Sequence, residues 1–331
     1  MSKVTTLFYR GKLIESSHNI KCYIGSVDGK GIFTTNNDND FIYPRSSIKI
    51  FQAIPFVSSN ALKVFNLNQK QIALSCSSHC GEDFHIRELQ KWIKKTKLKL
   101  SNLKCGAHNP LDSKSTEKLF LSGNKPNQLY NNCAGKHLAM LTSCLINNQN
   151  INNYLDYNHT HQKNIRKVFN KFTKTKLSKK NFSLDGCSAP QYSFKIKSIS
   201  KALNNLIKSY KDCYDYSEEV KILINSVLEN PEFIGGTGSF DTKVMKASKG
   251  KIFCKSGAEG VFLFIDIHNE ISGVVKITDG NERAIPISIL NIFKKLKVMT
   301  KEELNNLEKK EKFDLKNHAG RNIGHISLTM K

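Results

Sequence analysis

Strand-prone segments lie at both ends of the chain, and the long middle has mainly helical patterns. The β-prone runs are Val4–Tyr9, Ile20–Ile24 and Gly31–Thr35 near the start, and Val261–Ile267 and Ser272–Ile277 near the end. Strands from the two ends of a chain can share one sheet if the residues between them form a separate helical part. This order predicts an α+β fold, with an antiparallel sheet built from both termini and an inserted helical lobe.

The middle of the chain, from about residue 60 to residue 230, repeats apolar residues at helical spacing. Ile86, Leu89 and Trp92 follow this period, and Ser217–Leu228 opens with a serine and two glutamates, a typical helix start. No proline- or glycine-rich linker divides the sequence. We therefore predict a single domain over residues 1–331, with residues 1–60 and 230–331 in a sheet lobe and residues 60–230 in a helical lobe.

The chain is strongly basic, with 51 lysines and arginines against 28 acidic residues and a net charge of +23. Such a charge would suit a nucleic-acid binder. However, the lysines are spread along the whole sequence, and clusters such as Lys91–Lys99 resemble polar helix faces. No motif for nucleic-acid binding accompanies them, so we expect no nucleic-acid partner.

Two further features concern the cellular compartment. The N-terminal segment lacks the apolar region of a secretory signal, and no apolar run approaches membrane-spanning length. The nine cysteines are odd in number and follow no disulfide-framework spacing. We expect reduced thiols in a cytoplasmic protein without a membrane partner.

The segment Tyr43–Pro55 contains Ser46 and Lys49 at the S-x-x-K spacing. In a helix, residues three apart lie on one face, so the hydroxyl and the amine could touch. A serine hydroxyl needs a neighbouring group to take its proton before it can act as a nucleophile. A lysine can do so when burial or a nearby cation lowers its pKa. The alternative is a helix-capping serine followed by a solvated lysine.

Two later segments extend this pattern. Ser78 follows the β-prone run Ile72–Cys76, and Lys255-Ser256-Gly257 comes just before the strand Val261–Ile267. An S-x-x-K pair, a second serine and a K-[ST]-G segment, in that order, are typical of serine β-lactamases and penicillin-binding proteins. Ser78 could instead cap a strand end and Lys255 could be a surface lysine, but the ordered set favours a catalytic site.

Cysteine and glycine occur together in several other segments. Cys133 and Lys136 form a C-x-x-K pair, and Cys187 lies in a similarly tight context. Thiolates are plausible zinc ligands, whereas lysine must first lose its proton, so the spacing alone favours buried, inert cysteines. The glycine-rich segment Gly235–Asp241 lacks the lysine of a phosphate-binding loop, and Lys276–Ala284 carries Asp279 and Arg283 at a strand end.

A resemblance to a known family joins these segments. The blocks ESSH, PRSSIKIFQAIP, SSHCGEDFH, CGAHNP, NNCAGKHLAML, DGCSAPQYS, KSGAEG and KITDGNERA resemble the successive motifs of the Rhizobium-etli-type L-asparaginases, also called class 3 or asparaginase II. The resemblance runs from about residue 4 to the C-terminus. It implies a penicillin-binding-protein-like or serine-β-lactamase-like fold, a homodimer, and hydrolysis of L-asparagine to L-aspartate and ammonia.

The resemblance also implies roles for particular residues. It implies two serine–lysine tandems, a zinc ion held by the C-x-x-K pair with a distant cysteine, and three residues that contact substrate. The tandems are Ser46 with Lys49 and Ser78 with Lys255, the zinc ligands are Cys133, Lys136 and Cys187, and the substrate contacts are Arg45, His137 and Asp185.

The sequence departs from the family pattern at Ile50, where proline is usual, and at Cys80 within the Ser-His-x-Gly-Glu block. Neither change removes a catalytic group. The closest alternative function is an S-x-x-K amidohydrolase acting on glutamine or another small amide or peptide. A zinc-binding module without activity and a basic nucleic-acid binder are further alternatives.

Overall fold

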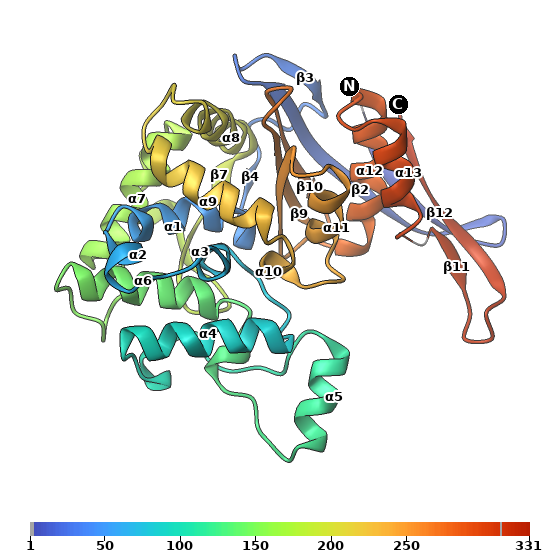
Figure 1. Ribbon diagram of the computed structural model, residues 1–331. Helices are drawn as coiled ribbons and strands as arrows, with labels where there is room; N and C mark the ends of the chain where they lie inside the picture. The colour runs from blue at the N-terminus through green and yellow to red at the C-terminus, as the bar shows by residue number, and fades with distance from the viewer. Residues whose placement is uncertain (1–2, 312) are drawn as a thin grey trace. The chain divides into compact units, whose positions relative to one another are not determined.

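The structure is a computed structural model that describes residues 3–311 and 313–331 (Figure 1). The chain divides into two compact units. We call residues 1–47, 194–207 and 243–331 the sheet unit, and residues 48–193 and 208–242 the helical unit.

The sheet unit contains an eight-stranded antiparallel sheet among its described residues, with strand order β11-β12-β1-β2-β10-β9-β8 and β3 paired to β2. The two ends of the chain meet in it, because Val4 pairs with Met330 and Ile20 pairs with Ile277. The prediction of an α+β fold with a sheet built from both termini is confirmed. The strands of this unit are β1 (Val4–Arg10), β2 (Leu13–Ser26), β3 (Gly31–Thr34), β4 (Phe41–Ile42), β7 (Phe194–Lys195), β8 (Ile252–Gly257), β9 (Val261–Asp266), β10 (Ile271–Ile277), β11 (Asp314–Lys316) and β12 (Asn322–Met330).

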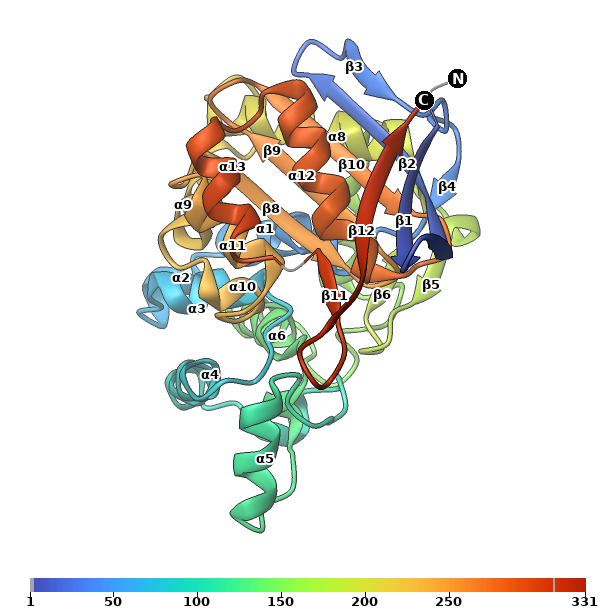
Figure 2. The ribbon, with the colours of Figure 1, turned by 90° about the vertical axis from the view of Figure 1, so that its right-hand side faces the viewer.

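Strand β9 is buried along its whole length because helices cover both faces of the sheet. On one face α12 covers the sheet (Figure 2). The Phe264 ring meets Phe293 of this helix edge to face, with 4.8 Å between ring centroids. On the other face the Ser272 hydroxyl donates to Asn204 of α8 at 2.6 Å. The helices are α12 (Ile285–Leu296) and α13 (Lys301–Glu308), with the 3₁₀ turn η5 (Glu282–Ala284). Three elements contribute residues to both units: η1 (Arg45–Ile48), α8 (Ile196–Tyr210) and α11 (Phe240–Ala247).

The helical unit is built around α1, which packs on α6, α7 and α9. Its Phe51 ring lies against Phe169 and Phe172 of α7, and Phe56 lies against Trp92 of α4. The elements are α1 (Lys49–Val57), α2 (Ala61–Val64), α3 (Gln69–Ser75), α4 (Asp83–Thr96), α5 (Ser113–Leu121), α6 (Ala134–Ile146), α7 (Thr160–Thr173), α9 (Ser217–Glu229) and α10 (Glu232–Gly235), the 3₁₀ turns η2 (Leu100–Asn102), η3 (Gln128–Tyr130) and η4 (Lys179–Asn181), and the hairpin β5 (Phe182–Leu184) with β6 (Pro190–Tyr192).

One local prediction is wrong. The run Ile72–Cys76 was expected to be β-prone, but most of it lies in α3. The helix begins with a capping box, in which Asn68 accepts from the Gln71 N–H and the Gln71 side chain accepts from the Asn68 N–H. This helix start and the packing of α3 on α6 outweigh the weak strand preference of one isoleucine. No helix among the described residues has the length and apolar character needed to cross a membrane.

Candidate active site

Ser46 lies in the 3₁₀ turn η1, directly before α1 begins at Lys49. The helix expected around the S-x-x-K pair therefore starts later than predicted, and the serine belongs to the turn that enters it. Ser46 is half-buried. Arg45 before it has a φ of +53°, a left-handed conformation that costs a residue with a side chain about 1 kcal/mol. Such backbone strain is often found at functional sites.

Lys49 is completely buried in the helical unit and reaches the second serine motif. Its Nζ donates to Ser78 Oγ at 3.0 Å and to the Ser77 carbonyl. Ser78 follows the end of α3, and its own N–H donates to the Ile234 carbonyl at 2.8 Å. The sequence paired Lys49 with Ser46, so its contact with Ser78 was not anticipated.

Lys255 lies in the sheet unit, inside strand β8 rather than before a strand. The side chain is buried, and its Nζ donates to the Ser256 carbonyl at 2.7 Å. Gly257 ends the strand against the backbone that carries the nucleophile candidate. A Cβ there would lie 2.5 Å from the Pro44 carbonyl oxygen and 3.3 Å from the Ser46 nitrogen. The glycine of the K-S-G segment is therefore needed for this close approach.

Cys133, Lys136 and Cys187 come together in the helical unit. Cys133 caps the N-terminus of α6, Lys136 lies in its first turn, and Cys187 lies in the loop of the β5–β6 hairpin. All three side chains are buried, and Lys136 Nζ donates to Cys187 Sγ at 3.1 Å. This contact joins the C-x-x-K pair of α6 to the distant Cys187.

The three ionisable groups of this cluster shift one another's pKa values. A hydrogen bond from Cys133 and the nearby Lys136 ammonium lower the pKa of Cys187 to about 4. Donation to Cys187, together with burial, raises the pKa of Cys133 to about 12. Burial opposes the charge on Lys136, but the two sulfur atoms and Asp185 outweigh it and raise the pKa of the lysine. These pKa shifts favour a thiolate on Cys187, a thiol on Cys133 and an ammonium group on Lys136.

Cys105 belongs to the same neighbourhood, although no role was predicted for it. Burial, followed by the charges of Cys133 and Cys187, raises its pKa to about 12. Asn131 ties the segments together, because its amide donates to the Cys105 carbonyl and its Oδ1 accepts from the Cys133 N–H, both at 2.9 Å. The signal in the sequence is the CGAHNP block, which places a cysteine beside glycine and histidine.

The three residues expected to contact substrate have different surroundings. His137 follows Lys136 in α6, is fully buried, and has its Nδ1 2.5 Å from the Tyr154 hydroxyl. Burial lowers its pKa to about 3. Asp185 is half-buried in the hairpin loop of Cys187, close enough to Lys136 to affect its pKa. Arg45 is half-buried in the sheet unit.

Comparison with known proteins places the chain in a class. A family model that describes amidohydrolases matches residues 7–328. The family is L-asparaginase II, and this chain belongs to it, so the family and the enzyme class predicted from the sequence are confirmed. The chain is also similar to the solved structure of a putative beta-lactamase from Bacteroides dorei DSM 17855, with 10% identity, a TM-score of 0.39, and 88% of this chain and 93% of that chain covered. A search of curated proteins found no match.

Proposed function

We propose that the protein hydrolyses L-asparagine to L-aspartate and ammonia as a Rhizobium-etli-type enzyme, with Ser46 as the nucleophile. The observation that carries the proposal is the position of Lys49. Lys49 is the first residue of the helix that follows the Ser46 turn. Its amine is completely buried and contacts the second motif serine, Ser78, at 3.0 Å. A serine needs a neighbouring base to act as a nucleophile, and a buried amine three residues from one motif serine and in contact with the other can take that role.

In the proposed reaction, Ser46 Oγ forms a bond to the side-chain carbonyl carbon of asparagine while Lys49 takes the hydroxyl proton. The carbon–nitrogen bond then breaks, and the nitrogen receives a proton and leaves as ammonia. A β-aspartyl ester of Ser46 remains. Water attacks this ester, and the proton that it loses returns to the Ser46 oxygen as L-aspartate departs.

Ser78 and Lys255 serve the proton transfers in this scheme. The contact between Lys49 and Ser78 offers a short route by which a proton can pass toward the leaving nitrogen. Lys255 carries a buried positive charge on the strand whose Gly257 adjoins the Ser46 backbone. Together they would deliver the proton to ammonia and then activate the water.

We further propose that Cys133, Lys136 and Cys187 hold a zinc ion. Two buried sulfur atoms and a buried lysine nitrogen that lies 3.1 Å from Cys187 Sγ are a donor set that suits zinc, once Lys136 has lost its proton. A bound zinc ion would supply a fixed positive charge that orients polar groups of the substrate. Arg45, His137 and Asp185 are proposed as direct substrate contacts.

The deciding experiment measures ammonia release by the purified protein from L-asparagine and L-glutamine and, in parallel, ring opening of a β-lactam by absorbance, because β-lactam hydrolysis releases no ammonia. We expect asparagine to be hydrolysed fastest. Faster hydrolysis of glutamine would favour the alternative S-x-x-K amidohydrolase. If none of the three substrates were hydrolysed, the result would contradict the proposal. A second series after treatment with a strong zinc chelator tests whether turnover depends on the metal.

We also propose a homodimer in the cytoplasm. The support is the family resemblance together with the nine free thiols. Light scattering at several protein concentrations tests the oligomeric state, and a monomer at all of them would contradict it.

A further inference from the structure

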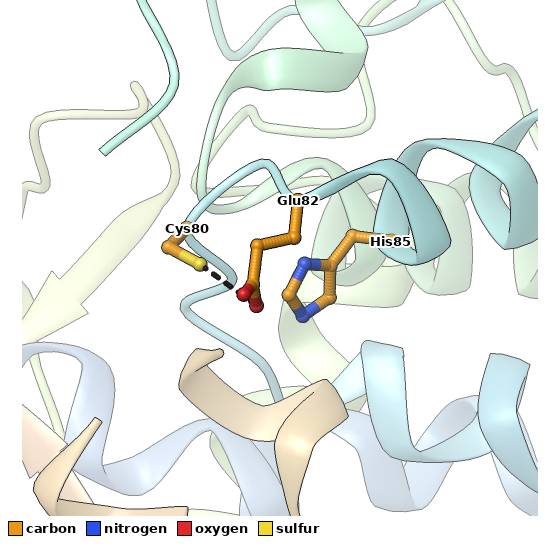
Figure 3. Close-up of side chains that lie close together, drawn as sticks. All are labelled: Cys80, Glu82 and His85. Atoms are coloured by element: carbon orange, nitrogen blue, oxygen red, sulfur yellow. Dashed lines mark hydrogen bonds between the residues drawn. The ribbon is translucent and has the colours of Figure 1, made fainter. Parts of the chain in front are cut away.

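A second group of metal-type ligands lies at the start of α4. Cys80 and Glu82 precede the helix, and His85 lies in its first turn (Figure 3). One potential ligand atom from each residue lies within 4.8 Å of the other two. All three belong to the helical unit, and none is among the zinc ligands proposed above.

The sulfur and the carboxylate already have the separation of two ligands on one ion. Cys80 Sγ lies 3.4 Å from Glu82 Oε2, to which it donates a hydrogen bond (Figure 3). Tetrahedral zinc, with bonds of about 2.3 Å to sulfur and about 2.1 Å to oxygen, separates such atoms by about 3.5 Å. Replacing the thiol proton with a metal ion would therefore need little movement.

The tautomer of His85 leaves one ring nitrogen able to bind a metal ion. Its Nε2 lies 3.0 Å from the Glu232 carbonyl oxygen. Because a carbonyl only accepts, Nε2 carries the proton and Nδ1 keeps its lone pair. The ring is fully buried, and Nδ1 has no hydrogen-bond partner among the described residues. Metal-binding histidines commonly donate one ring nitrogen to a carbonyl and offer the other to the metal.

The glycine-rich segment Gly235–Asp241 packs over the same cluster. A Cβ at Gly236 would lie 2.3 Å from Cys80 Sγ and 3.1 Å from Glu82 Oε2, so only glycine leaves this space free. Thr237 then orients the carboxylate, because its N–H and hydroxyl donate to Glu82 at 2.9 Å and 2.6 Å. This glycine-rich segment therefore packs against Cys80 and orients the Glu82 carboxylate.

We propose that Cys80, Glu82 and His85 bind a zinc ion, with the fourth position open to water or another small ligand. One thiolate, one imidazole and one carboxylate are donors that zinc accepts. The thiol loses its proton to solvent when its sulfur binds the metal, so the charge balances.

Zinc content per chain tests the site. Wild type, Cys80→Ser and His85→Gln are dialysed against the same low free zinc concentration and measured by elemental analysis. The glutamine amide can still donate to the Glu232 carbonyl, so this variant removes the lone pair and keeps the second hydrogen bond. We expect each variant to hold about one zinc ion fewer than wild type, whereas Cys213→Ser, at an exposed cysteine, keeps the wild-type content. Equal zinc in folded Cys80→Ser and in wild type would overturn the proposal.

A second measurement needs no variant. Iodoacetamide labelling followed by peptide mass analysis compares Cys80 with and without added zinc. We expect zinc to slow the labelling of Cys80 at least about tenfold while exposed Cys213 reacts at an unchanged rate. Equal labelling of Cys80 in both conditions would contradict the site. Neither measurement depends on catalysis, so failure of the proposed asparaginase mechanism would leave this test intact.

Discussion

The two units contain clusters of ionisable groups that differ in their exposure to solvent. In the sheet unit His18 lies between Asp279, at 2.6 Å, and Arg283, at 3.2 Å, and the Asp279 side chain is 48% exposed. In the helical unit Cys133, Lys136 and Cys187 are closed off from solvent.

This difference in exposure indicates which cluster is the better candidate for a reactive site. Water screens the exposed carboxylate of the sheet cluster, so its ion pair has a modest effect on stability. A buried cluster must instead balance its charges internally, and each proton shift there has a large energetic effect. Groups with strongly shifted pKa values mark functional candidates, which favours the helical unit. Ser46 and Lys255, however, belong to the sheet unit, and the following experiments separate the contributions of the two units.

The largest expected effect concerns the nucleophile. Ser46 of the sheet unit and Ser78 of the helical unit are the two candidates. We expect Ser46→Ala to lower kcat by at least about 10³-fold while asparagine still binds, because the substitution removes only the attacking oxygen. Ammonia release and calorimetry on the same preparation measure the two effects. If Ser78→Ala is inactive and Ser46→Ala remains active, the helical unit supplies the nucleophile.

The second prediction separates the two buried lysines. Arginine keeps the charge of lysine but does not give up its proton near neutral pH. Lys49→Arg should therefore lose about as much activity as Lys49→Ala, roughly 10² to 10⁴-fold, if the amine is the general base. Lys255→Arg should be milder if that residue acts mainly through its charge. An active Lys49→Arg enzyme would indicate that Lys255, in the sheet unit, is the general base.

The third prediction compares close backbone packing in the two units. A Cβ at Gly135 of α6 would lie 2.1 Å from the Leu74 backbone oxygen of α3, whereas at Gly273 of β10 it would meet the Phe264 ring at 2.0 Å. A ring can shift more readily than a carbonyl held by its chain. We expect Gly135→Ala to lower the free energy of unfolding by about 3 kcal/mol and Gly273→Ala by about half as much.

Chemical denaturation at pH 7 measures these costs. Gly238→Ala is the control, because its Cβ would meet nothing within 4 Å. It should change the free energy of unfolding by no more than about 0.5 kcal/mol. A larger loss at Gly273 than at Gly135 would reverse the comparison.

The last prediction concerns acid stability. Burial lowers the pKa of His161 in α7 from 6.5 to about 3, with a smaller contribution from the charge of His159. As pH falls below 6.5, the unfolded state takes up a proton that the folded state refuses, so the folded state loses stability down to about pH 3. The slope is about 1.4 kcal/mol per pH unit, or about 2 kcal/mol at pH 5.

Unfolding curves between pH 7 and pH 4 measure that slope. His161→Gln cannot take up the proton, so its stability should fall less steeply than that of wild type. His325→Gln, at an exposed histidine of the sheet unit, serves as the matched control and should keep the wild-type slope. An unchanged slope in His161→Gln would show that this histidine does not contribute to acid unfolding.

Much of the fold could be predicted from the sequence because its signals are local. The β-prone runs Val4–Tyr9 and Val261–Ile267 correspond to strands Val4–Arg10 and Val261–Asp266. The helical spacing of Ile86, Leu89 and Trp92 corresponds to the helix Asp83–Thr96. The prediction for Ile72–Cys76 was wrong because a capping box and a helical neighbour decided the conformation of a short, ambiguous run. Eight motif blocks in a fixed order were also enough to predict the family that residues 7–328 match.

What the sequence determined about the site is which residue types stand at motif spacing, such as Ser46 with Lys49 and Cys133 with Lys136. Spacing describes neighbours within a turn of helix, because only there does the chain itself bring side chains together. The contact of Lys49 with Ser78 and that of Lys136 with Cys187 join separate segments. Packing of α1, α3, α6 and the β5–β6 hairpin decides which of these side chains meet, and only the tertiary structure could reveal it.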